Sequence, residues 1–436
     1  MPVRKNWQSL ALPALALALS LSLLQAAQAM EKQDNPEQWP LWLQAAPEHN
    51  LRVPALDLPQ ARPAAPDAPW LERWGRLAPA MAWNDIAIEL IVKYQQNPLR
   101  ATRALALLHA AMHDALVLCA RAQCEATAMR VAQHAAAGRL LSHMYPQENP
   151  GRFGALALSA VHATLSAQPA DGKVQAAWRI GHGAGQAAIA RALDDGADLA
   201  RDLAARPAAK PGIWRAAPPV NIHDPTEPRA GQWRPWALLH GAEIEPPPPI
   251  AYDSPAYWAE VEEVRRVAAA LTPQQKKIAE DWHLDAGSVT PAGVWNLHAR
   301  RVALDAKLDM VQTTRLFAAL NSAMMDAFVA CWHAKLKWWT QRPISAIRDK
   351  YDPQFLPYIV TPPFPSYVSG HASASGAASS VLGAFFPATA EEFRRSAEEA
   401  ALSRLYGGIH FSSDNLEGLK LGQRVAVRVL ARMQGR

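Results

Sequence analysis

The sequence predicts an all-α fold built from helical bundles. Stretches of alternating apolar and polar residues with β-branched side chains are almost absent, whereas long segments rich in alanine and leucine repeat apolar residues at helical spacing. Alanine favours helix and lets neighbouring helices pack closely. Hydrophobic residues make up 50% of the 436 residues, which is enough for a large core.

The first 29 residues have the pattern of a secretory signal peptide. Arg4 and Lys5 precede an apolar run over 10–24, and Ala27-Gln28-Ala29 fits a cleavage site. The run is short for a membrane span, so we expect export, most simply to a bacterial periplasm, and no stable membrane insertion after cleavage. An uncleaved anchor is the alternative interpretation.

After the signal peptide over 1–29, composition divides the chain into four parts. We predict an irregular segment rich in Pro and Trp over 30–80, a helical half over 81–205, a proline-rich connecting loop over 206–252 and a second helical half over 253–436. Helices of the first half are predicted over 86–94, 99–118, 131–144, 152–168 and 172–193, with Asn84 or Asp85 as the first cap. Those of the second half are predicted over 254–271, from 273 onward, and over 290–308, 313–338, 373–385, 391–406 and 414–433.

Two features inside the predicted helices bear on packing and redox state. Gly181, Gly183 and Gly185 superficially suggest a nucleotide loop, but no strand precedes them, so close helix packing is the better interpretation. Cys119 and Cys124 are near enough in sequence to pair in an oxidising compartment, and small buried hydrophobic residues are the alternative.

Charge argues against a nucleic-acid partner. The formal net charge is +5, and no run of Lys and Arg occurs outside the extreme N-terminus. A nucleic-acid binder usually carries a basic stripe or a known module, and the sequence shows neither.

Three short clusters in the last quarter of the chain carry the candidate chemistry. The first runs from Lys335 to Pro343. Pro343 ends a preceding helix and favours an extended Arg342. A lysine and a forked guanidinium at one place suit an anion with several oxygens, although both also complement the dipole at a helix C-terminus.

The second cluster is Ser369-Gly370-His371, which follows a rigid run of prolines over 362–365. We expect it at the start of a helix, where free backbone N–H groups bind anions. Gly370 permits close approach of the backbone, Ser369 adds a hydroxyl donor, and His371 is placed for proton transfer. A capped helix with an incidental histidine is the alternative.

The third cluster contains Arg404, His410 and Asp414. If a helix starts near His410, Asp414 lies one turn further on the same face. A carboxylate bonded to one ring nitrogen fixes the tautomer and leaves the other nitrogen free to ligate a metal or attack phosphorus. A purely structural His–Asp pair is the alternative.

Together the clusters resemble a signature shared by vanadium-dependent haloperoxidases and type 2 phosphatidic-acid-phosphatase-like acid phosphatases. Its members here, K-x6-RP, SGH and SR-x3-G-x-H-x3-D, are Lys335, Arg342-Pro343, Ser369-Gly370-His371, Ser403-Arg404, Gly408, His410 and Asp414. A looser resemblance to the bacterial haloperoxidase-like branch extends upstream. The resemblance implies a fold of helical bundles with the site in the second.

In the haloperoxidase branch, the resemblance implies that His410 binds vanadate as cofactor with Asp414 behind it. Lys335, Arg342, Ser369, Gly370 and Arg404 would hold the oxyanion, and His371 would deprotonate hydrogen peroxide. Lys335 would also polarise the peroxide toward attack by halide. In the phosphatase branch, with no metal, His410 would attack a phosphate ester and form a phosphohistidine while His371 protonates the leaving group.

Two aromatic residues favour the haloperoxidase branch. Trp332 and Phe364 resemble positions near the halide site of chloroperoxidases, although plain core packing explains them equally well. Val368 stands where many haloperoxidases have proline before Ser-Gly-His, which leaves halide preference open.

A non-catalytic oxyanion-binding protein is the third interpretation. Large helical enzymes of this kind often self-associate as homo-oligomers, but no heptad seam is visible.

Overall fold

The computed structural model describes residues 35–43, 56, 77–165, 170–199 and 206–435. The predicted signal peptide and most of the predicted irregular segment 30–80 lie outside the described residues. Across the described ranges the regular structure is helical, with one isolated antiparallel bridge between Ile213 and Thr340. The predicted all-α fold is confirmed.

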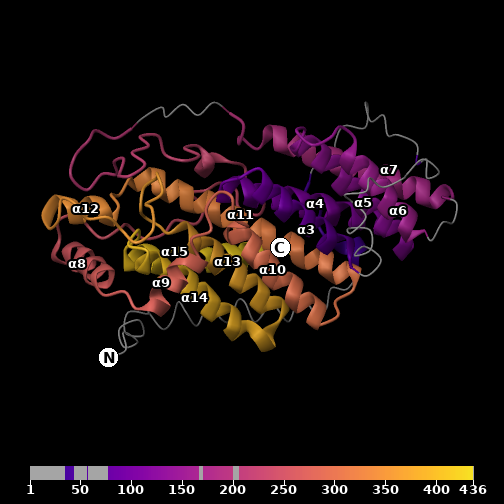
Figure 1. Ribbon diagram of the computed structural model, residues 1–436. Coiled ribbons are helices and arrows are strands. Elements are labelled where there is room, and N and C mark those ends of the chain that lie inside the picture. The colour runs from indigo at the N-terminus through magenta and orange to yellow at the C-terminus, as the bar shows by residue number, and fades with distance from the viewer. Residues whose placement is uncertain (1–34, 44–55, 57–76, 166–169, 200–205, 436) are drawn as a thin grey trace.

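The first group of helices lies at one end of the molecule in Figure 1. It comprises α3 (Pro79–Lys93), α4 (Pro98–Arg121), α5 (Ala126–Met144), α6 (Arg152–Thr164) and α7 (Gly172–Asp194). Helix α4 is long and apolar enough to cross a membrane by length and composition, but 94% of its apolar window is buried inside the protein. Its end is tied to the start of α5 by a disulfide bond between Cys119 and Cys124.

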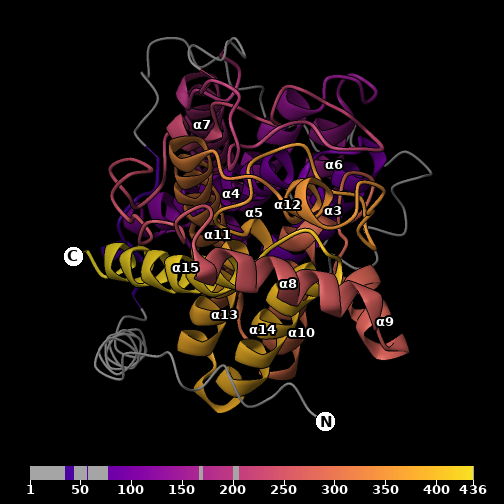
Figure 2. The ribbon, with the colours of Figure 1, turned by 90° about the vertical axis from the view of Figure 1, so that its left-hand side faces the viewer.

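The second group follows the proline-rich loop and reaches the opposite end of the molecule, where α8 and α12 lie (Figures 1 and 2). It comprises α8 (Pro255–Ala269), α9 (Pro273–Asp281), α10 (Thr290–Asp305), α11 (Met310–Trp338), α12 (Pro343–Lys350), α13 (Gly370–Phe385), α14 (Ala390–Tyr406) and α15 (Ser412–Met433). The 3-10 helices are η2 (Pro36–Gln38), η5 (Ala230–Gln232) and η6 (Pro387–Thr389). The division into domains at the predicted boundaries stays a prediction.

Helix α11 is the central element, and most of its side chains are buried. Asn321 on α11 and Asn296 on α10 exchange two side-chain hydrogen bonds of 2.8 and 2.9 Å. Five residues after Asn321, the buried carboxylate of Asp326 accepts hydrogen bonds from the backbone N–H groups of residues 236, 237 and 238. Because an unpaired buried carboxylate is costly, these bonds fix the proline-rich loop against α11.

The loop runs along one edge of the molecule from the first helical group to α8 (Figure 1). Trp332 on α11 donates its indole N–H to the carbonyl oxygen of Thr226 over 3.0 Å, and the N–H of Thr226 donates to the carbonyl oxygen of Pro363. The loop therefore joins α11 to the segment that leads into α13.

Helices α13 and α15 are in backbone contact. A Cβ atom added at Gly422 would lie 2.1 Å from the carbonyl oxygen of Ser373, and one at Gly376 would lie 2.3 Å from that of Leu419. Because neither position has room for a side chain, the two helices approach more closely than ordinary packing allows. This contact brings together the starts of both helices, where two of the signature clusters lie.

Two local predictions are wrong. The first helix begins at Pro79, since proline is well suited to the first helical position, and Asn84 is a buried interior residue bonded to His109 over 3.1 Å rather than a cap. Helix α12 was not predicted, because Pro343 marks the start of this short helix and not only the end of a preceding one. Arg342 is extended, with φ −85° and ψ 156°, as predicted.

The glycine run in α7 gives a test of close packing. A Cβ at Gly181 would lie 2.1 Å from the carbonyl oxygen of Ala132 on α5, whereas one at Gly183 would meet nothing within 4 Å. We therefore expect Gly181→Ala to lower the free energy of unfolding by about 1–3 kcal/mol. Gly183→Ala should leave it unchanged or raise it by up to about 1 kcal/mol. Thermal melts of both variants check this, and equal shifts in Tm would contradict the packing.

Candidate functional site

His410 and Asp414 form the centre of the candidate site. Helix α15 begins two residues after His410, so Asp414 lies in its first turn. The Nδ1 atom of His410 lies 2.9 Å from Oδ2 of Asp414, and both side chains are almost fully buried. A carboxylate at Nδ1 favours the tautomer that carries its proton there, which leaves a lone pair on Nε2. Arg342 donates from Nη1 to this Nε2 over 2.9 Å.

Three buried cations surround this pair. Lys335 comes from the last turns of α11, Arg342 from the start of α12 and Arg404 from the end of α14. Burial lowers the pKa of Lys335 to about 7 and those of Arg342 and Arg404 to about 9. Water is excluded from all three groups, which strengthens their interaction with any anion that enters.

Backbone carbonyl oxygens accept hydrogen bonds from all three cations and compensate part of their charge. Lys335 donates to the carbonyl oxygens of Pro365 and Ser366, both over 2.8 Å. Arg342 donates to those of Phe364 and Ile409. Arg404 donates to the hydroxyl of Ser403 and to the carbonyl oxygen of Trp282. Within the described part of the chain, no carboxylate lies within ion-pair distance of these three cations.

The start of α13 forms another wall. Ser369 is the N-cap, and its hydroxyl accepts a hydrogen bond from the N–H of Ala372. Its own N–H donates to the carbonyl oxygen of Asp414 over 3.0 Å, which links α13 to α15. A Cβ at Gly370 would lie 3.3 Å from the ring of Phe328, so the glycine lets the helix start pack against α11.

Two buried nitrogen atoms in the site lack a hydrogen-bond partner. These are Nη2 of Arg342 and Nε2 of His371. Burial, followed by the charge of Arg404, lowers the pKa of His371 well below its usual range, so its imidazole is neutral at pH 7. Burial and then the charge of Arg342 do the same for His410. An unpaired guanidinium nitrogen within a surplus of buried positive charge is suited to an oxyanion.

The two predicted aromatic residues lie beside Lys335. The rings of Trp332 and Phe364 have centroids 5.0 Å apart. The Nζ atom of Lys335 lies 5.6 Å from the centroid of the Trp332 ring and 5.1 Å from that of Phe364. The structure thus brings together all the residues that the sequence singled out.

Sequence reasoning missed three residues that hold this centre. Ser366 donates from its hydroxyl to Oδ2 of Asp414 over 2.5 Å. Glu260 on α8 accepts hydrogen bonds from the N–H and the hydroxyl of Ser413, each over 2.7 Å, and Glu263 accepts one from the hydroxyl of Ser412. The two glutamates therefore fix the first turn of α15. Ser366 lies between the proline run over 362–365 and the second cluster, where its position gave a signal, whereas the glutamates resemble an ordinary polar helix face.

The fold and site define an all-helical protein with a buried cluster of cations around a histidine–carboxylate pair, and known proteins share the fold. The family described as the VCPO second helical-bundle domain matches residues 315–396 and 387–436. Vanadium chloroperoxidase from Curvularia inaequalis is 28% identical over 156 residues, which cover 27% of this chain and 26% of that enzyme. The match thus spans about a quarter of the relative's length.

Solved structures extend the likeness of fold to most of the chain. A bacterial vanadium-dependent iodoperoxidase superposes with a TM-score of 0.63 and 24% identity, over 80% of this chain and 95% of that one. A holo-type bacterial vanadium-dependent chloroperoxidase superposes with a TM-score of 0.58 and 17% identity, over 89% of this chain and 99% of that one. Residues 315–436 thus match this family's second helical-bundle domain, as the signature predicts, and the chain resembles the solved vanadium haloperoxidases in fold.

Glu260 makes stability depend on pH. Burial raises its pKa to about 7, against the opposing hydrogen bond from Ser413. A carboxyl whose pKa is raised on folding stabilises the folded state at pH values below its unfolded pKa, and this contribution is lost as pH rises toward 7. Between about pH 4.5 and 7.5 we expect the free energy of unfolding of the wild type to fall relative to Glu260→Gln by about 1–3 kcal/mol.

Urea unfolding at several pH values measures this difference. Glu262→Gln is the control. The hydrogen bond from Arg265 lowers the pKa of Glu262, so removing this carboxyl group changes the pH dependence of the free energy of unfolding in the opposite direction. Parallel curves for the wild type and Glu260→Gln would contradict the prediction.

Proposed function

We propose that the chain is a vanadate-dependent haloperoxidase, which oxidises halide with hydrogen peroxide to hypohalous acid. The observation that carries this proposal is the surplus of buried positive charge around His410, with Nη2 of Arg342 still unpaired. Vanadate is an oxyanion whose oxygens need several charged donors, so the residues present fit it. The family match over residues 315–436 and the likeness in fold to the peroxidases described above support the same assignment.

Each residue of the site has a proposed role. His410 would hold vanadate through Nε2, with Asp414 keeping the proton on Nδ1. Arg342, Arg404 and Lys335 would neutralise its oxygens, aided by the hydroxyl of Ser369 and the N–H of Gly370. When bound, vanadate supplies a centre at which hydrogen peroxide becomes an oxidant of halide.

His371 would accept a proton, and Lys335 would supply positive charge beside the aromatic pair. His371 is neutral at pH 7 and has an unpaired Nε2, so it is suited to accept a proton from incoming peroxide. Lys335 presents its Nζ beside the paired rings of Trp332 and Phe364. A weakly hydrated halide would enter this dry aromatic region beside Lys335. Lys335 would polarise the peroxide toward attack by that halide.

We also propose that the protein is exported. The pattern at residues 1–29 supports this, and so does the disulfide bond between Cys119 and Cys124, since such bonds persist in oxidising compartments. The periplasm is the compartment that we propose.

A paired assay tests the function. The purified protein is reconstituted with orthovanadate and supplied with hydrogen peroxide, a halogen acceptor and chloride, bromide or iodide in turn. The vanadium-free protein is tested in parallel on a chromogenic phosphate ester. We expect halogenation that depends on both vanadate and peroxide. Ester hydrolysis inhibited by vanadate, without halogenation, would instead assign an acid phosphatase that acts through His410. The absence of both activities would indicate a non-catalytic oxyanion-binding protein.

The two histidines should respond differently to substitution. His410→Ala removes the proposed ligand atom, so we expect vanadate retention to fall on the order of 100-fold or more. His371→Ala should retain vanadate but slow turnover by about 100-fold to 10,000-fold. Vanadium content after desalting measures the first effect and steady-state halogenation the second. His240→Ala, at an exposed position, is the control. The reverse pattern would exchange the two roles.

A further inference from the structure

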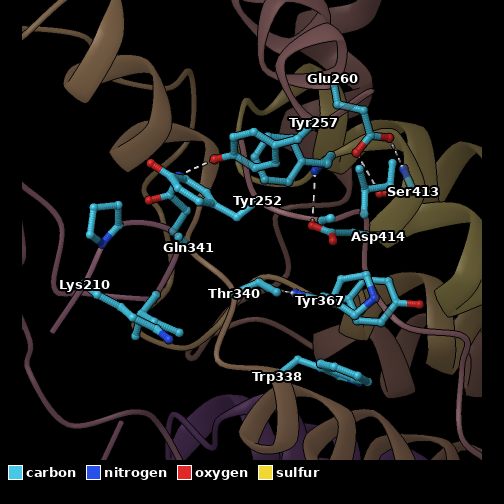
Figure 3. A pocket seen from close by; sticks show the side chains of 17 residues that line it. Lys210, Tyr252, Tyr257, Glu260, Trp338, Thr340, Gln341, Tyr367, Ser413 and Asp414 are labelled. Carbon is cyan, nitrogen blue, oxygen red and sulfur yellow. Dashed lines mark hydrogen bonds between the residues drawn. The ribbon is translucent and has the colours of Figure 1, made fainter. Parts of the chain in front are cut away.

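A cavity lies beside Asp414. It has a volume of about 580 Å³, and we call it the α8 cavity. Its walls come from the segments 210–213 and 249–252, helix α8, residues 338–341 and the start of α15 (Figure 3). None of the predicted site residues except Asp414 lines it. The volume is in the range of pockets that bind small organic molecules.

Five aromatic side chains line the cavity. They are Tyr252, Tyr257, Trp338, Tyr367 and Phe411. The centroid of the Tyr257 ring lies 5.3 Å from that of Tyr252 and 5.8 Å from that of Phe411. Rings from three separate segments therefore gather around one space, which favours a flat apolar ligand.

Three of the four carboxyl oxygens in the walls already accept hydrogen bonds. Both oxygens of Glu260 accept hydrogen bonds from Ser413, and Oδ2 of Asp414 is taken by Ser366, Phe411 and His410. A cationic ligand would find no free carboxylate pair at these two residues. An anionic ligand would face the carboxyl oxygens of these two residues, and Lys210 stands only at the exposed rim. An uncharged ligand is therefore favoured.

Gln341 supplies the unmet hydrogen-bonding group. It lines the cavity, and its side chain is buried, with 2% exposure. Its Nε2 atom donates to the hydroxyl of Tyr257, whereas Oε1 has no partner (Figure 3). Since a buried acceptor without a partner is costly, a ligand whose O–H or N–H group reaches this oxygen gains a hydrogen bond.

We propose that the α8 cavity binds an uncharged aromatic molecule with a hydrogen-bond donor, of the phenol class, with the donor directed to Oε1 of Gln341. This site is separate from the oxyanion centre and does not depend on the proposed peroxidase function. Its test therefore uses the full chain without vanadate, so its failure would leave the proposed function intact.

Calorimetric titration with phenol and with anisole tests the proposal. The two molecules share the ring, but anisole lacks the donor. We expect saturable binding of phenol, tighter than that of anisole by about threefold to tenfold. Gln341→Met should remove this difference. Gln133→Met is the matched control, because Gln133 is also buried with an unpaired Oε1 but does not line the cavity. The control should bind phenol as the wild type does.

A second variant keeps the test decisive if Gln341→Met fails to fold, as circular dichroism would show. Ile250→Trp fills the cavity from its wall and should abolish phenol binding. Retained binding in that variant would overturn the proposal. Absence of phenol binding to the wild type, equal affinity for anisole, or tighter binding of benzoate or benzylammonium would overturn it as well.

Discussion

The constraint on which this structure depends is the burial of three cations around one histidine–carboxylate pair. An isolated charge costs several kcal/mol when it leaves water, so each cation needs compensation from fixed dipoles. Helices supply few such dipoles, because their carbonyl oxygens are consumed by internal hydrogen bonds. Lys335 and Arg342 accordingly bind carbonyl oxygens of the irregular segments at residues 364–366 and 409. The non-helical segments are therefore part of the site and not merely connections.

Those segments need supports of their own, and the rest of the fold provides them. Asp326 holds three consecutive N–H groups of the proline-rich loop, and the loop in turn contacts Pro363 through Thr226. On the other side, Glu260 and Glu263 fix the first turn of α15 through Ser413 and Ser412. A chain of hydrogen bonds thus connects distant elements to the geometry of His410 and Asp414.

The sequence was sufficient to predict the helical fold and the residues that gather at the site. Long alanine-rich periods predict helices well, and the signature residues lie in compact motifs whose chemistry can be read directly. The start of α3 at Pro79 and the existence of α12 were missed, because proline marks the beginning of a helix as well as the end of one. The spacing of Cys119 and Cys124 left pairing open, and the structure shows the bond.

The supporting residues were beyond sequence reasoning for a different reason. Glu260 and Glu263 are three residues apart on a helix, a spacing that equally describes a solvated face. Their role depends on where α15 begins relative to α8, which is a property of the tertiary packing. The same holds for Gln341, whose hydrogen-bond partner Tyr257 lies 84 residues away in sequence.

The pattern of charge also explains why such a site favours binding over stability. The carbonyl oxygens compensate the cations only partly, as the lowered pKa values of Lys335, Arg342 and Arg404 indicate. An anion that enters restores the charge balance and regains electrostatic free energy that folding alone could not recover. An anion that binds the folded state and not the unfolded one would stabilise the fold by an amount that grows with the logarithm of its affinity. The protein thus maintains a destabilised, preorganised centre at the expense of its own stability, and the long, tightly packed helices around α11 make that possible.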